Sequence, residues 1–69
     1  MPLTMASAGI KNTILKITGK DETKSFLKSL GFIEGEEVTI VNEIGGNLIV
    51  AIKDSRIALD KSMANRIIV

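Results

Sequence analysis

Apolar and polar positions along the chain follow short runs that predict strands, interrupted by one stretch with helical spacing. Residues 13–18, TILKIT, are rich in β-branched side chains and stop at Gly19, which predicts a strand. The remaining β-rich runs are short and are separated by glycine or polar residues. They predict strands at residues 3–5, 37–42, 48–52, 56–59 and 67–69.

One helix is predicted over residues 22–30. Phe26, Leu27 and Leu30 recur at helical spacing and form one apolar stripe. Asp21 is a candidate N-cap, because its carboxylate can accept from the free N–H groups of the first turn. The helix therefore has about two and a half turns.

Glycines and short polar side chains mark the predicted turns. Gly31 suits a left-handed helix C-cap. Residues 43–47 contain Gly45-Gly46 and predict a hairpin turn, because glycine reaches positive φ at no steric cost. Residues 62–65 predict a single helical turn that Asp60 or Ser62 would cap.

The order of these elements predicts a mainly β protein. Two strands are followed by the helix, a meander of three strands and a last strand. Strands of about five residues joined by short hairpins favour a small, strongly bent β-barrel of about five strands with one inserted helix. The whole chain, residues 1–69, is expected to form a single domain.

Two of the predicted strands are apolar on both faces. Residues 48–52, LIVAI, and residues 67–69, IIV, show no alternation of apolar with polar side chains. Either the helix and the N-terminal segment cover the second face, or a partner docks on it. Strands of this kind also permit self-association, so we expect a monomer or a weak homodimer.

The absence of certain residue types excludes several classes of function. The 69-residue chain contains no cysteine and no histidine, which excludes disulfides, thiol nucleophiles, histidine-based triads and the usual zinc sites. No phosphate-cradling glycine-rich loop is present. We therefore expect a protein without catalytic residues, cofactor or tight metal site, which acts by binding a larger partner.

The expected compartment is the cytoplasm. Lack of cysteine fits a reducing environment. The first nine residues have neither the basic nor the apolar region of a signal peptide. No window approaches the ~20 apolar residues that a membrane-spanning helix needs, so direct membrane insertion is not expected.

The charge balance argues against a nucleic-acid partner. Nine basic and eight acidic residues give a net charge of +1. Residues 35–41 have the glycine-valine spacing with which small RNA-binding barrels begin a strand. Those barrels stack bases on aromatic side chains, whereas Phe26 and Phe32 are both predicted to lie in the core.

Two charged clusters leave alternatives open. Glu34, Glu36 and Glu37 could hold a divalent cation weakly, but neighbouring side chains on an extended segment alternate faces, which favours a solvated turn. Lys24 and Lys28 share a helix face with Lys20 just before it, and this face is either a solvated surface or a basic stripe for an acidic partner.

The candidate contact residues combine this helix face with the turn after it. A second choice is the apolar region around the hairpin. The first set is Lys24, Lys28, Phe32, Ile33 and Glu34, and the second is Ile44 and Leu48.

An ordered series of segments resembles the bacterial ferrous iron transport protein A family, FeoA. Residues 9–19 are similar to its opening strand. Residues 27–35, with Leu30-Gly31 and Glu34-Gly35, resemble its helix that ends in Leu-Gly before a Pro-Gly turn. Residues 56–59 and 64–69 resemble its closing strands. The chain departs from the family at Glu34, where proline is usual, in the short hairpin loop, and at Asp60, where a basic residue is common.

The resemblance implies an SH3-like barrel with a helix inserted after the first long strand. It implies a cytosolic accessory protein of ferrous iron uptake that acts on the membrane transporter FeoB, at its cytosolic G-protein domain. The C-terminal domain of DtxR-type repressors has a similar fold, so a metal-sensing module is one alternative and a small RNA-binding barrel is another.

Overall fold

The computed structural model describes residues 1–69 as six strands, two α-helices and one 3₁₀ helix. The strands are β1 (Lys11–Thr13), β2 (Lys16–Ile17), β3 (Glu37–Ile44), β4 (Asn47–Ile52), β5 (Ser55–Asp60) and β6 (Ile67–Ile68). The helices are η1 (Leu3–Met5), α1 (Asp21–Ser29) and α2 (Lys61–Ala64).

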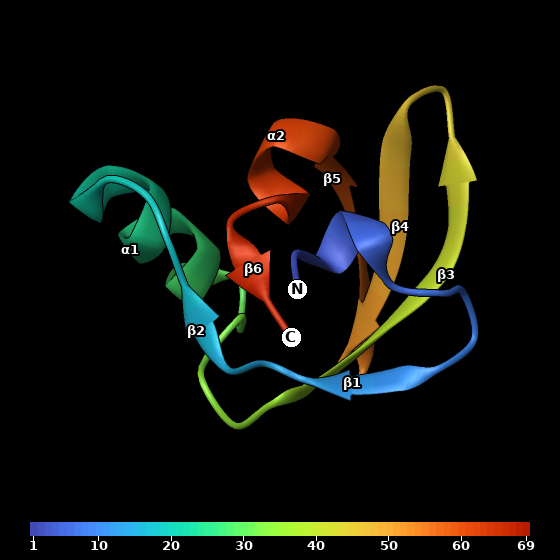
Figure 1. The fold of residues 1–69 in the computed structure, drawn as a ribbon, viewed down its shortest axis with the longest axis horizontal. Helices are drawn as coiled ribbons and strands as arrows, with labels where there is room; N and C mark the ends of the chain where they lie inside the picture. The colour runs from blue at the N-terminus through green and yellow to red at the C-terminus, as the bar shows by residue number, and fades with distance from the viewer.

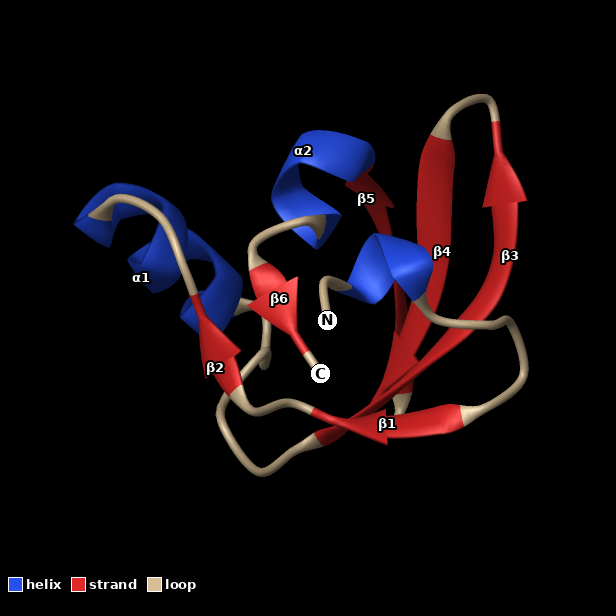
Figure 2. Ribbon diagram, in the orientation of Figure 1, coloured by secondary structure: helices blue, strands red, loops and turns tan.

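The strands form two antiparallel sheets. One has four strands in the order β1-β3-β4-β5, and the other pairs β2 with β6 (Figure 1). The β-sheets curve around a common interior, and α1 lies to one side of them (Figure 2). This arrangement confirms the predicted mainly β, SH3-like barrel with one inserted helix of nine residues.

The first long strand is divided between the two sheets, so the prediction of one strand over residues 13–18 was wrong. β1 pairs with β3 and β2 pairs with β6. At the bend, the Ile14 N–H donates to the Glu36 carbonyl at 2.9 Å, and the Leu15 N–H donates to the Ile68 carbonyl at 2.7 Å. The chain therefore changes sheets without leaving its N–H groups unpaired.

Residues 3–5 form a 3₁₀ turn rather than the predicted strand. The Met5 N–H donates to the Pro2 carbonyl at 3.0 Å, which closes the turn. This conformation turns Leu3 fully into the core, where it is 0% exposed, and leaves Met5 71% exposed. Thr4 donates to the Asn65 side chain and so links the turn to the end of α2.

Of the two predicted caps of α1, the C-cap is confirmed and the N-cap was wrong. Asp21 is the first helical residue rather than the predicted N-cap; Lys20 occupies the cap and makes no side-chain capping bond. At the other end Gly31 has φ +104°, as predicted for a left-handed C-cap. The Gly31 N–H donates to Lys28 and the Phe32 N–H donates to Leu27, the two bonds of a Schellman motif.

The meander β3-β4-β5 is built from two hairpins with two-residue turns. Gly45 and Gly46, both at positive φ, join the pair Ile44–Asn47, as the primed hairpin turns require. The second turn, between Ile52 and Ser55, confirms the predicted meander. A bulge between Ile40 and Asn42 bends β3.

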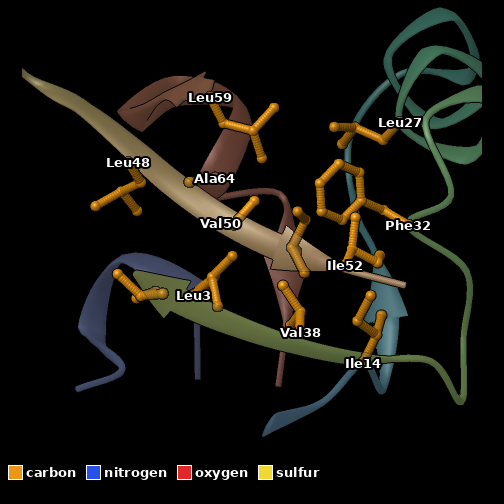
Figure 3. Packing of buried hydrophobic residues seen from close by; sticks show 12 residues of the cluster. Leu3, Ile14, Leu27, Phe32, Val38, Leu48, Val50, Ile52, Leu59 and Ala64 are labelled. Atoms are coloured by element: carbon orange, nitrogen blue, oxygen red, sulfur yellow. The ribbon is translucent and has the colours of Figure 1, made fainter. Parts of the chain in front are cut away.

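Twelve buried residues make one continuous hydrophobic core between the sheets and the helices (Figure 3). From α1 the core receives Leu27, which is 0% exposed, whereas Phe26 is 49% exposed. The prediction that Phe26 lies in the core was therefore wrong. The helix buries the side that carries Leu27, and Phe26 is turned about 100° away from it.

Strand β4 buries one face and leaves the other partly open. Leu48, Val50 and Ile52 belong to the core, while Ile49 and Ala51 lie on the outer face of the sheet and are half-buried. The chain's own elements thus cover the second apolar face of this strand incompletely.

Candidate functional site

A groove of about 350 Å³ lies between α1, the loop after it and strand β2. Strand β2 contributes Ile17, and the helix contributes Lys24 and Lys28. The loop contributes Phe32, Ile33 and Glu34. The groove thus joins residues on both sides of the inserted helix, and its lining is half hydrophobic.

The helix geometry explains why both lysines face the groove. Measured around the helix axis from buried Leu27, Lys24 and Lys28 lie roughly 60° and 100° to the same side, while Phe26 lies to the other side. Lys24 and Lys28 are exposed, so their ammonium groups stand at the rim next to solvent. Burial of Leu27 therefore orients the lysine pair.

The Schellman motif fixes the floor of the groove. Because the Phe32 N–H donates to the Leu27 carbonyl, the chain reverses direction tightly after Gly31. The Phe32 side chain is 0% exposed and lies beside Leu27 in the core (Figure 3). Its neighbour Ile33 then points outward and is 38% exposed.

The charges of the groove are not neutralised within the chain. Two ion pairs occur, Lys53–Glu36 at 3.7 Å and Lys61–Glu43 at 3.4 Å, and neither includes a groove residue. Lys24 and Lys28 against Glu34 leave an excess of one positive charge beside the exposed Ile33. Such a surface can bind an apolar side chain that carries an acidic neighbour.

The structure gathers the first set of predicted contact residues into this groove. Ile44 lies elsewhere, at the tip of the β3–β4 hairpin, and is 60% exposed. Leu48 is 5% exposed within the core and so, like Phe32 at 0% in the first set, offers no side-chain surface to a partner. It alternates with outward-facing Asn47 and Ile49, and the register that buries β4 turns it inward.

Sequence reasoning missed Ile17 as a groove residue. Ile17 pairs with Ile67 of β6 and is half-buried. Nothing in its local sequence indicates contact with the helix that follows. Its place in the groove depends on how α1 folds back past β2.

The glutamates before β3 do not form a metal cluster. No group of three or more His, Cys, Asp or Glu side chains is placed to hold a metal ion. Glu36 pairs with Lys53, and with Glu37 and Lys11 it lines a second, polar hollow of about 360 Å³ on the outer sheet face. Positive and negative charges balance there, which makes it a weaker candidate for selective binding than the α1 groove.

No helix in the structure has both the length and the apolar character needed to cross a bilayer. The fold and the groove together define a small β-barrel with a mixed apolar and basic surface beside its inserted helix.

The family model for the FeoA domain matches residues 1–69, so the chain belongs to the FeoA family. It is therefore a small SH3-like protein of a family linked to ferrous iron transport. A comparison with curated protein sequences finds no match.

Solved structures of FeoA proteins have the same fold. A crystal structure of the iron uptake regulatory protein FeoA is 24% identical, with a TM-score of 0.87 over 97% of this chain and 91% of that chain. Stenotrophomonas maltophilia FeoA, complexed with zinc and described as a prokaryotic SH3 domain protein, is 30% identical, with a TM-score of 0.85 over 99% of this chain and 87% of that chain.

Two longer chains contain the same barrel. Iron(II) transport protein A from Clostridium thermocellum is 29% identical, with a TM-score of 0.89 over 97% of this chain and 43% of that chain. A manganese-dependent transcriptional repressor is 20% identical, with a TM-score of 0.85 over 97% of this chain and 39% of that chain. The repressor shares the fold, and at this identity the likeness carries no function.

Proposed function

We propose that this protein is a non-enzymatic cytosolic adaptor that binds the ferrous iron transporter FeoB at its cytosolic G-protein domain and modulates iron uptake. The proposal rests on membership of the FeoA family together with the α1 groove. That groove collects unpaired basic residues and a partly exposed isoleucine on one surface.

The exposure of each groove residue determines what it would contribute to binding a partner. Ile33 and Ile17 provide apolar area that a partner can remove from water, at about 25 cal/mol per Å². Lys24 and Lys28 stand at the rim, where exposed charges affect the rate of association and partner choice more than affinity. Buried Phe32 keeps the loop in one conformation, which reduces the entropy lost on binding.

Titration of the isotope-labelled protein with the purified G-protein domain of FeoB tests the proposal by NMR. We expect the largest chemical-shift changes at Lys24, Lys28, Ile33 and Glu34. The Ile44 amide at the hairpin tip should change little, because it lies outside the groove.

Two double variants that each remove two positive charges distinguish binding at the groove from non-specific electrostatic attraction between the two proteins. Lys24→Gln with Lys28→Gln should weaken binding about two- to thirtyfold, since exposed ion pairs contribute ~0.2–1 kcal/mol each. Lys11→Gln with Lys53→Gln removes the same charge from the second hollow and should leave binding nearly unchanged. Equal loss in both variants would contradict a contact at the groove, and absence of any shift at high micromolar partner would contradict the adaptor role.

A further inference from the structure

Strand β5 is the outermost strand of the four-stranded sheet and has one free edge. It pairs with β4 along its whole length, from Ser55 to Asp60, with no break in register. It contains neither a bulge nor a proline, which are common features of protected edges. In Figure 2, β5 stands at the end of the sheet, beyond β4.

The register shows which backbone groups the free edge presents. The two-residue turn closes on Ile52–Ser55, which must be a hydrogen-bonded pair. Hydrogen-bonded pairs then recur at Val50–Ile57 and Leu48–Leu59. The N–H and C=O groups of the residues between them, Arg56 and Ala58, therefore point away from β4.

These groups have no partner inside the molecule. No hydrogen bond outside the strand ladder involves the backbone of Arg56 or Ala58. Both residues are exposed, and Ile57 between them is only half-buried although its side chain is on the core face. Backbone donors and acceptors in such a row are a template for another strand.

We infer that this edge pairs antiparallel with β5 of a second copy, with the twofold axis at Ala58. Only outward-pointing residues can exchange hydrogen bonds across the new ladder, and by the same alternation Asp60 points outward as Arg56 and Ala58 do. Among the registers that this allows, Ala58 opposite Ala58 places Arg56 opposite Asp60 of the second copy. That register places opposite charges directly across from each other at both ends of the pairing. The strand is thus complementary in charge to itself.

The outer face of the sheet supports the same register. Ala58 lies opposite half-buried Ile49 of its own chain. Pairing across the axis joins the two alanines and the two isoleucines into one apolar strip. The small alanine side chains allow close approach at the axis.

The pairing buries little surface, so the dimer is weak. A strand of six residues is only about 20 Å long. The surface area buried by pairing two such strands is smaller than the area buried in stable complexes. We expect dissociation in the high micromolar to millimolar range. No residue that lines the α1 groove belongs to β5, so dimerisation leaves that groove open.

Sedimentation of the full chain over a range of concentrations, together with amide exchange by NMR, tests the inference. We expect the average mass to rise with concentration and the exchange of the Arg56 and Ala58 amides to slow in parallel. Ala58→Pro removes an outward N–H at an edge position where proline is tolerated, and it should abolish association while the fold is kept.

A charge-reversal pair keeps the test valid if the proline variant does not fold. Arg56→Asp places like charges across the axis and should weaken association at least tenfold. Lys11→Asp makes the same change in the same cross-strand row but on the opposite edge strand, β1, and should leave association unchanged. A monomer at millimolar concentration would overturn the inference, as would self-association that Lys11→Asp weakens and Arg56→Asp does not.

Discussion

At the scale of single residues, Asp60 shows how one side chain joins two elements. It ends β5 and caps α2, where its carboxylate accepts from the Met63 N–H at 2.8 Å and from the Ser62 hydroxyl at 2.8 Å. These bonds favour the charged form and lower the pKa of Asp60 below its usual value, chiefly through the Met63 N–H.

The pH dependence of Asp60→Ala follows from this lowered pKa. Because the folded-state pKa is depressed, the cap stabilises the fold above the unfolded-state pKa and is lost as the pH falls through the folded-state value. We expect Asp60→Ala to lower Tm by a few degrees at neutral pH and to differ less from the parent as the medium becomes acidic. Thermal unfolding followed by circular dichroism over a pH series measures this, and a difference independent of pH would contradict it.

Capping residues illustrate what a sequence can reveal at this scale. Asp60 was correctly predicted as a candidate cap, because a short polar side chain before a helical turn acts on its immediate neighbours. The same argument failed at Asp21, one residue beyond the actual cap at Lys20. Both aspartates precede a predicted helical segment, and the path of the chain entering the helix decides which of them caps it.

At the scale of elements, α1 is attached to the barrel mainly through one fully buried side chain. Leu27 is the only residue of the helix with a buried side chain, while Leu30 just beyond its end is half-buried. The Schellman motif holds the C-terminal end through backbone bonds. The helix therefore depends on a small number of contacts.

Two adjacent truncations measure this dependence. Leu27→Ala leaves a cavity in the core and should lower the free energy of unfolding by about 2–5 kcal/mol. Phe26→Ala removes a larger side chain from a 49% exposed position and should cost less than ~1 kcal/mol. Urea unfolding of both variants gives the comparison, and a larger loss for Phe26→Ala would show that the helix packs by its other side.

The position of a helix or strand in the sequence could be predicted better than which of its sides is buried. Helix α1 was found within one residue because its apolar spacing and Gly31 are local signals. Phe26 and Leu27 both lie at helical spacing with Leu30, so the choice of buried side is made by the barrel. The break after β1 has the same origin, since β3 and β6 compete for adjacent residues of one strand.

At the scale of the whole molecule, the barrel is closed by segments from opposite ends of the chain. Lys16 pairs with Ile68, and Pro2 forms a bridge with Ile68 as well. The two termini lie side by side in Figure 1. Closure thus requires contacts between residues that are far apart in sequence.

This topology predicts slow folding for a protein of its size. Loop closure must precede the pairing of β2 with β6, and small barrels rich in non-local pairs fold in roughly milliseconds to seconds. Stopped-flow dilution from urea, followed by far-ultraviolet circular dichroism, should resolve this phase. Complete refolding in microseconds would contradict the inferred closing step.

The order of elements allowed the barrel class to be predicted, since short strands and tight turns leave few ways to close a sheet. The candidate groove could be predicted only in part. Lys24, Lys28 and the loop residues are close in sequence, whereas Ile17 joins them through the fold. Self-complementarity of β5 could not be found either, because it depends on which strand lies at the edge of the sheet.

The light attachment of α1 has an evolutionary consequence. Residues 18–36 leave one sheet and return to the other, and within this excursion only Leu27 and Phe32 are buried. Exposed residues of this excursion can therefore be substituted, and the excursion can lengthen or shorten, while the β-sheets keep their own packing. Related barrels could acquire new interaction partners by exchanging this cassette alone.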